Sequence, residues 1–523
     1  MTVPAPGVAP RHPSPPHPLR QAAALALAAL FAALVASLAG CTVGPDYVRP
    51  DTPLPDTWRE TQPANDQWKV AQPASIDASQ DWWAAYGDST LNGLIEAAMA
   101  ANQTLRQAEA SYRQARALTQ QARAGLFPTL DANVTSGRAR AFGNGAPSVA
   151  NSHAALFDAS WEVDLWGLVR RAVEGARDTE QAFAADLAAA RLSIQAEVAQ
   201  DYIQLRITDV LKDLFARTVA ADEESLKLTQ SQFRAGVATA ADVSLAQVTL
   251  ESARAQGIDL DVQRTQFEHA LAVLTGQAPA AFALPPADPV TPLAMRVLAV
   301  PPGLPSALLE RRPDIAAAER RMAAANAEIG VARAAYYPQL TLSASGGFSS
   351  ASLASWFGAP GRVWSLGAGL AQTLFDGGLR GARNDQAVAA YDQAAGAYRQ
   401  TVLSALQEVE DSLAALRVLD QEVVVQDRAV AAARNAERVT LAQYRAGTAQ
   451  YLSVITAQQL ALTNERTAIQ LRGREFAASV ALVTALGGGW DADALARPPA
   501  AAPARTPAAA ALPDASRSSP SRS

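Results

Sequence analysis

The chain has 523 residues, of which 49% are hydrophobic and 18% charged, so it can bury one or more sizeable cores and is not wholly disordered. Its formal net charge of −6 argues against a nucleic-acid partner, because neutralising phosphates requires a clustered excess of Lys and Arg. One cysteine and four histidines are too few for a structural zinc or a redox dithiol site, so we expect no metal.

Residues 1–40 are typical of an export signal. Arg11 and Arg20 precede an apolar run at residues 22–36, which is too short and too rich in alanine for a transmembrane helix. The run ends in Leu-Ala-Gly-Cys41, which resembles a bacterial lipobox. We expect Cys41 to become the acylated N-terminus, with covalent lipid such as palmitate as its membrane anchor. The alternative is an ordinary signal peptide that ends near a cysteine. Thr42 follows, and the absence of Asp there resembles lipoproteins sent to an outer membrane.

The rest of the chain repeats itself. Residues 148–278 and 361–497 contain no proline, so two equivalent blocks without helix breakers are present. The sequences of these halves match at an offset of 210 residues, and near their ends at an offset of 211. The matched pairs are Arg123 with Arg333, Phe127-Pro128 with Tyr337-Pro338, Leu130 with Leu340, Gly167 with Gly377, Arg170 with Arg380, Asp201 with Asp411, and Phe233-Arg234-Ala235-Gly236 with Tyr444-Arg445-Ala446-Gly447. One register holding across both halves predicts an internal duplication.

This repetition defines the predicted organisation. The segments are a signal peptide at 1–40, a lipid-anchored N-terminal segment at 41–90, a first repeat at 91–275, a linker at 276–308, a second repeat at 309–490 and an Ala/Pro-rich tail at 491–523. The tail has no apolar period, so we expect it to be disordered.

Each half is predicted to carry one β-hairpin. Apolar and polar residues alternate at 130–135 and, after a Gly/Asn/Pro/Ser loop at about 143–152, again at 155–164; residues 340–349 and 366–370 repeat the pattern. Strands of about ten residues with one apolar face are typical of a membrane barrel with a wet lumen. The alternative is two soluble hairpins. Four strands cannot close a barrel, so a barrel would have to be shared between chains.

A very long helix is predicted after each hairpin, from about 167 to 235 and from about 377 to 446. Apolar residues recur at three- and four-residue steps, as at Ile194, Val198, Tyr202 and Leu205, which favours coiled-coil packing. Each helix ends at a Gly that follows an Arg by two residues, a pattern typical of a glycine C-cap. A return helix then begins near Asp242 or Ser453, so each half is predicted to form a long antiparallel helical hairpin.

Seven motifs in this order resemble the outer-membrane factors of tripartite efflux systems, the TolC-like channels, and specifically their lipoprotein branch. The similarity covers residues 41–490. The motifs are Cys41-Thr42-Val43-Gly44-Pro45-Asp46-Tyr47, Asp164-Leu165-Trp166-Gly167, Phe233-Arg234-Ala235-Gly236, Leu309-Glu310-Arg311-Arg312-Pro313-Asp314-Ile315, Leu374-Phe375-Asp376-Gly377-Gly378, Tyr444-Arg445-Ala446-Gly447 and Gly487-Gly488-Gly489-Trp490.

The resemblance implies an α+β membrane protein that works as a homotrimer. Three chains would donate four strands each to one 12-stranded outer-membrane barrel, and their helices would continue as an α-helical barrel through the periplasm. The channel would be a passive exit duct for drugs, other toxic small molecules or metal ions. An inner-membrane pump, commonly of the resistance-nodulation-division class, would deliver them through a periplasmic adaptor. No nucleophile, base and orienter grouping and no phosphate-binding motif occurs in the sequence, so we expect no enzyme activity and no cofactor beyond the lipid. The competing hypothesis is a non-conducting trimeric coiled-coil lipoprotein, a scaffold or adhesin.

The resemblance also implies two sets of functional residues at the periplasmic tips. The adaptor would dock at Arg234, Gly236, Arg445 and Gly447; the alternative is that these residues only form the turns. A gate would be closed by Asp242, hydrogen-bonded to Tyr444 or Arg445, and by Leu452. The alternative is that Asp242 simply caps its helix, and the two roles are compatible. Positions that are often acidic in the family are Ser453 and Thr456 here, so the constriction ring is expected to bind divalent cations weakly.

Overall fold

The computed structural model describes residues 42–50, 53–60, 81–143, 146–286, 305–492 and 495. The predicted signal peptide, Cys41 and nearly all of the predicted tail lie outside these residues, as do residues 287–304 of the predicted linker. Among the described helices, none combines the length and the apolar character needed to cross a membrane.

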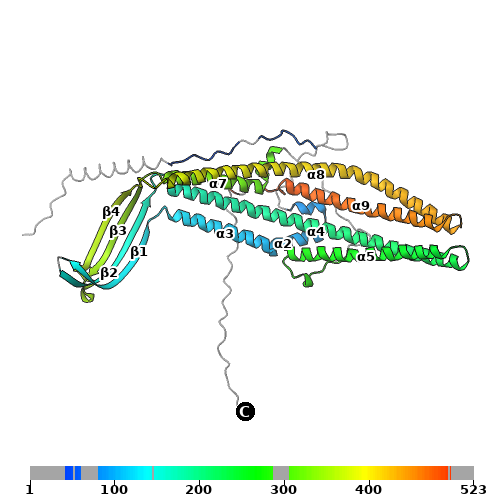
Figure 1. Ribbon diagram of the computed structural model, residues 1–523, viewed down its shortest axis with the longest axis horizontal. Coiled ribbons are helices and arrows are strands. Elements are labelled where there is room, and N and C mark those ends of the chain that lie inside the picture. Colours follow the sequence, from blue (N-terminus) through cyan, green and yellow to red (C-terminus); the bar gives the residue numbers. More distant parts are fainter. Residues whose placement is uncertain are drawn as a thin grey trace, which may run out of the picture.

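Each half consists of a helix, a β-hairpin and a long helical hairpin (Figure 1). The first half contains α2 (Ser89–Ala101), α3 (Gln103–Ala124), β1 (Thr129–Gly143), β2 (Ala146–Val163), α4 (Leu168–Arg234) and α5 (Ala240–Leu274). The second contains α6 (Leu308–Arg311), α7 (Pro313–Ala334), β3 (Gln339–Ser350), β4 (Arg362–Ala371), α8 (Leu379–Arg445) and α9 (Tyr451–Ala485). Short 3-10 turns are η1 (Trp82–Tyr86), η2 (Pro279–Ala281), η3 (Pro305–Ala307), η4 (Leu353–Ser355) and η5 (Ala359–Gly361).

The duplication extends to the lengths of the helices. α3 and α7 have 22 residues each, α4 and α8 have 67, and α5 and α9 have 35. At a rise of about 1.5 Å per residue, α4 and α8 are each about 100 Å long, as predicted. Both begin after a glycine in the left-handed region, Gly167 at φ 85° and Gly378 at φ 93°.

These glycines correct one detail of the sequence alignment. The starts and the ends of α4 and α8 are both related by 211 residues, so the offset changes before the helices begin. Asp411 is therefore the structural counterpart of Gln200, and Asp201 that of Ser412. By the same count Gly167 corresponds to Gly378 and Arg170 to Gly381. The matches at an offset of 210 to Gly377, Arg380 and Asp411 were therefore each wrong by one position, because a neighbouring Gly, Arg or Asp matches by chance.

The four strands form one antiparallel sheet in the order β1-β2-β3-β4. The predicted loop at about 143–152 was wrong, since β1 continues to Gly143 and pairs with β2 from Ala146 onward. Backbone pairing does not require alternating side chains, and the small residues of this stretch hid the strand. The hairpin β1–β2 therefore extends beyond the pairing of β2 with β3, which stops at His153 and Ser350.

The helices lie side by side in a curved layer that leads away from the sheet, with the α4–α5 and α8–α9 turns at the far end (Figure 1). Nearer the sheet, the packing order is α3-α4-α7-α8, and farther away it is α5-α4-α9-α8. α3 and α5 thus occupy one edge of the layer, and α8 the other. The main core surrounds the middle of α4, where Tyr202, Ile203 and Leu205 pack among Trp82, Trp83, Tyr86 and residues of α2, α5 and α9.

Candidate functional site

The sheet has one apolar and one polar face. Cross-strand partners point to the same side, so the register assigns each side chain to a face. The apolar face carries Leu130, Val134, Phe157, Trp161, Leu340, Leu342, Phe348, Trp364, Leu366 and Leu370, and the other carries Asp131, Asn133, Asp158, Ser160, Glu162, Thr341, Ser343 and Ser345. On the apolar face, Leu130, Val134, Phe157, Leu366 and Leu370 are all more than 60% exposed in the single chain. Exposed apolar area of this extent marks an interface with lipid or with another protein.

The N-terminal segment begins at the junction of sheet and helices. The amide of Val43 donates to the carbonyl oxygen of Trp166 at 3.0 Å, and a Cβ on Gly167 would lie 3.0 Å from the side chain of Thr42. Farther along, Asp46 pairs with the buried Arg171 at 2.7 Å. From this junction the segment runs along the helices toward their middle, where Glu60 pairs with Arg417 (Figure 1). The chain end that would carry Cys41 is thus held at the base of the strands.

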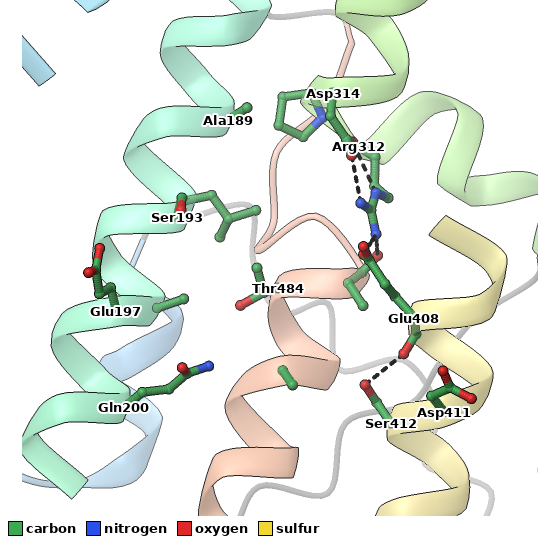
Figure 2. Close-up of a pocket in the computed structure, with 15 residues that line it drawn as sticks. Ala189, Ser193, Glu197, Gln200, Arg312, Asp314, Glu408, Asp411, Ser412 and Thr484 are labelled. Atoms are coloured by element: carbon green, nitrogen blue, oxygen red, sulfur yellow. Dashed lines mark hydrogen bonds and ion pairs between the residues drawn. The ribbon is translucent and has the colours of Figure 1, made fainter. Parts of the chain in front are cut away.

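A recess of about 610 Å³ lies where α7 begins and α9 ends (Figure 2). Arg312 is 7% exposed and donates to the carbonyl oxygen of Ala485 at 3.0 Å, to Glu408 at 2.7 Å and to Asp314 at 2.6 Å. A cation that binds the last carbonyls of α9 is favourable at this negative helix end. Pro313 at the first helical position and Asp314 in the first turn both favour the start of α7 here. Arg312 therefore joins α9 to α7 end to end, and the α4 and α8 side chains Glu197 and Asp411 line the same recess.

The first half has the same joint with a neutral residue. Asn102 caps α3 through the amide of Leu105 and donates to the carbonyl oxygen of Leu274, the last residue of α5, at 2.9 Å. Close backbone approach requires glycine beside both joints: a Cβ on Gly276 would lie 2.6 Å from the carbonyl oxygen of Ala101, and one on Gly487 2.0 Å from that of Arg311. Because of these joints, α3 with α5 and α7 with α9 each form a nearly continuous rod alongside the long helices α4 and α8. No group of three or more His, Cys, Asp and Glu side chains in the described part of the chain could hold a metal ion.

The residues predicted to dock an adaptor lie at the two exposed tips. Gly236 and Gly447 have φ of 75° and 76°, in the left-handed region that favours glycine. Arg234 contacts Ser231 of its own helix at 3.1 Å, and Arg445 forms an exposed pair with Glu224 at 3.4 Å. Both guanidinium groups are therefore only weakly held and could meet a partner.

The predicted gate residues lie together at the tips, but among the described residues the expected bond from Asp242 to Tyr444 or Arg445 is not formed. Asp242 accepts hydrogen bonds from the amide and hydroxyl of Thr239 at 2.8 Å, both through Oδ2, and so closes the capping box of α5. The hydroxyl of Tyr444 lies 3.2 Å from that of Thr229, and among the described residues neither Tyr444 nor Arg445 is bonded to Asp242. Burial raises the pKa of Tyr444, and the nearby charge of Asp242 adds to the rise.

The second tip lacks this capping box. Gln450 precedes α9 without a side-chain cap, and Ser453 stands where α5 has Asp242. Leu452 is 57% exposed, and Ser453 and Thr456 are exposed beside it. Instead, Tyr444 and Tyr451 pack at 5.2 Å between ring centres in a small buried cluster with Ala246 and Val454. Aromatic packing therefore stabilises this tip, whereas a polar capping box stabilises the other.

Two tip residues were missed by sequence reasoning. Thr229 is fully buried and contacts Tyr444, and Asp222 is 4% exposed with no hydrogen-bond partner for Oδ2. Burial raises the pKa of Asp222 to about 6, with Glu437 as the second cause. Comparing equivalent positions of the two repeats could have identified Asp222, because the equivalent residue of α8 is the apolar Ala433. A charge where the duplicate has alanine marks an unusual buried group.

Both free edges of the helical layer carry apolar residues at heptad spacing. On α5, Val248, Ala255 and Val262 lie opposite the buried side, and the two valines are 63% and 56% exposed. On α8, Val418, Val425, Ala432 and Val439 follow the same spacing, and the valines are 39–58% exposed. A sustained seven-residue repeat is the pattern of a helix that packs against another helix.

Most of the chain is similar in sequence and in structure to known proteins. The model of the family described as "Outer membrane efflux protein" matches residues 94–277 and 304–488. The outer membrane protein OprJ of Pseudomonas aeruginosa is 34% identical over 480 residues, which cover 90% of this chain and 96% of OprJ. The toluene efflux pump outer membrane protein TtgC of Pseudomonas putida is 31% identical over 461 residues, 87% of this chain and 93% of TtgC. The solved outer-membrane channel OprN superposes with a TM-score of 0.80 at 32% identity, over 86% of this chain and all of that one.

Proposed function

Because the chain belongs to the outer membrane efflux protein family, we propose that it is the exit duct of a tripartite efflux system. It is an outer membrane protein, and its fold is that of the TolC-like channels. The duct would pass drugs or other toxic small molecules, delivered by an inner-membrane pump through a periplasmic adaptor. The relative TtgC is named for toluene efflux, which supports small organic molecules as cargo.

One observation carries the proposal: every layer of the molecule has two open edges. β1 and β4 are each paired on one side only, and such edges are not tolerated in lipid. The helical layer ends in the α5 and α8 apolar repeats, which need a partner of the same length. Three copies placed edge to edge would give 12 strands and a helical wall, with β4 and α8 of one chain against β1 and α5 of the next. The polar face of the sheet would then line a wet lumen.

A lipid anchor on Cys41 fits this arrangement. Thr42 lies beside Gly167 at the base of the strands, so an acyl chain on the preceding residue would start at the periplasmic membrane surface. Acyl chains contribute about 0.8 kcal/mol per buried methylene, so several chains would hold the segment durably. Cys41→Ser should abolish incorporation of labelled fatty acid and leave assembly intact. Equal labelling of wild type and variant would contradict the anchor.

The gate would be a contact between chains. Oδ1 of Asp242 has no partner among the described residues, so it is free to accept a bond from Arg445 of a neighbour. A charge-assisted bond of about 1.5–3 kcal/mol, repeated three times, would keep the tips closed together with Leu452. With Ser453 and Thr456 in the ring, divalent cations should block weakly, and Thr456→Glu should create the block.

Adaptor docking provides the test that separates a duct from the competing scaffold or adhesin. We expect crosslinking in cells to capture an adaptor at the tips, and Arg234→Ala combined with Arg445→Ala to weaken capture while the assembly stays intact. Arg399→Ala, an exposed arginine on α8 far from the tips, is the matched control. A double variant that crosslinks and exports like wild type would reject docking through these residues.

A further inference from the structure

The apolar face of the sheet ends in an aromatic cluster on the side away from the helices. The connection between β3 and β4 folds back onto this face, so that Trp356 lies 5.6 Å from His153 and Phe357 lies 5.5 Å from Phe348, measured between ring centres. Trp356 and Phe357 stack at 5.0 Å. Aromatic girdles at the ends of an apolar band are typical of the membrane–water interface of barrels.

Three arginines lie on the same face of the sheet, in or next to this aromatic cluster. Val134 and Ser136 point to the apolar side, and by alternation so do Arg138 and Arg140, whose cross-strand partners are Asn151 and Val149. Arg362 pairs with Phe348 and therefore also points outward. All three arginines are exposed and have no ion pair within the described chain.

The charge of this region has one sign. Residues 132–157 and 342–375 contain the three arginines and no Asp, Glu or Lys. The acids of the hairpins, Asp131, Asp158 and Glu162, occur toward the helical end and on the polar face. Because β1 and β4 are the sheet's edges, closure between chains would bring Arg362 of one chain beside β1 of its neighbour. The outer rim would thus become a continuous cationic belt.

We propose that Arg138, Arg140 and Arg362 bind the phosphate groups of phosphorylated glycolipid in the outer leaflet. This inference depends on the proposed function, because it requires the four strands to cross the outer membrane. Guanidinium groups suit the site, since their fork binds phosphate oxygens in pairs, and the aromatic cluster fixes them at the headgroup level. The arginines leave the sheet on the lipid side, so lumen cargo would not meet them.

Binding of bisphosphorylated and dephosphorylated lipid A to the full-length detergent-solubilised protein, measured by native mass spectrometry, tests the site. We expect wild type to prefer the phosphorylated lipid at least tenfold. The variant R138Q/R140Q/R362Q should lose about fivefold in affinity for each arginine removed. The variant R138K/R140K/R362K, which keeps the charge but not the fork, should lose less affinity than the glutamine variant. The variant R113Q/R399Q/R466Q, with the same charge loss on exposed helical positions, should bind like wild type.

Equal affinity of wild type for the two lipids, or equal binding by the wild-type protein and the R138Q/R140Q/R362Q variant, would overturn the inference. Conductance of the Asp242→Ala protein, whose gate is expected to be open, in a neutral planar bilayer separates this failure from failure of the duct. A conducting protein without lipid preference loses only the lipid site, whereas a trimer that never conducts loses the proposed function.

Discussion

The two halves of the chain have helices of the same lengths but very different surroundings. α4 is packed extensively against α2, α3, α5, α7 and α9, whereas the extensive helix contacts of α8 are with α7 and α9. Residues 54–60 and the tip of α4 add smaller contacts to α8. As a result, α4 buries Tyr202, Arg206 and Asp209, and most side chains of α8 stay exposed in the single chain. The duplicated sequence thus forms two long helices of equal length, but only α4 is covered by other helices of the same chain on both sides. In the proposed trimer, a neighbouring chain would cover the other.

The largest expected effect comes from the free edge of α5. Val262→Asp would place a charge in the proposed contact with α8 of the next chain, where its burial without a partner is costly. We expect loss of the trimer, measured as the native mass of the solubilised protein. Gln256→Asp, at another exposed residue on a different side of α5, should leave the trimer intact. A trimeric Val262→Asp protein would show that this edge is not an interface.

A second test uses counterparts with opposite burial. Asp209 accepts from Arg264 at 2.7 Å and from Arg206 at 3.2 Å, and these arginines hold the carbonyls of Leu284 and Pro285. Its counterpart in α8, Asp420, is exposed. Breaking a buried pair costs about 3–5 kcal/mol, and an exposed site about 0.5 kcal/mol or less. Asp209→Asn should therefore lower the thermal midpoint strongly and Asp420→Asn hardly at all; equal shifts would contradict the difference between the walls.

The smallest effect concerns the tip, where α4 buries Asp222 and α8 has Ala433. The raised pKa of about 6 means that the folded state holds the proton more tightly, so stability falls as pH rises from about 4 to 6. Between pH 5 and 7 the loss is about 1 kcal/mol. Hydrogen exchange at residues 218–226, corrected for its intrinsic pH dependence, should show this loss in wild type and not in Asp222→Asn. If both proteins respond to pH in the same way, Asp222 is not the cause of the response.

Periodicity and spacing predicted the fold well where a local pattern determines the structure. The two-residue alternation located the strands, and Arg-x-Gly located the ends of α4 and α8, because strand pairing and helix caps depend on neighbours in sequence. The extension of β1 and β2 to Gly143 and Ala146 was missed, since backbone pairing there leaves no apolar pattern.

Contacts between segments far apart in the chain could not be predicted from the sequence. The joint of Arg312 to Ala485 spans 173 residues, and the burial of Thr229 against Tyr444 spans 215. Nothing in the local pattern indicates such partners. Asp242 was found through a family resemblance, and its position at the start of the return helix also predicted a capping role. The capping box with Thr239 shows that role, because the Thr-x-x-Asp spacing is a local signal.

Planar-bilayer conductance of the purified protein, wild type beside Asp242→Ala, tests most directly whether three chains close into a gated duct. We expect both proteins to be trimers, with low resting conductance in wild type and clearly higher conductance in Asp242→Ala, because the latch between chains is lost. Trimers that conduct in neither form would contradict the duct. Conductance that is identical in the two forms would contradict the gate.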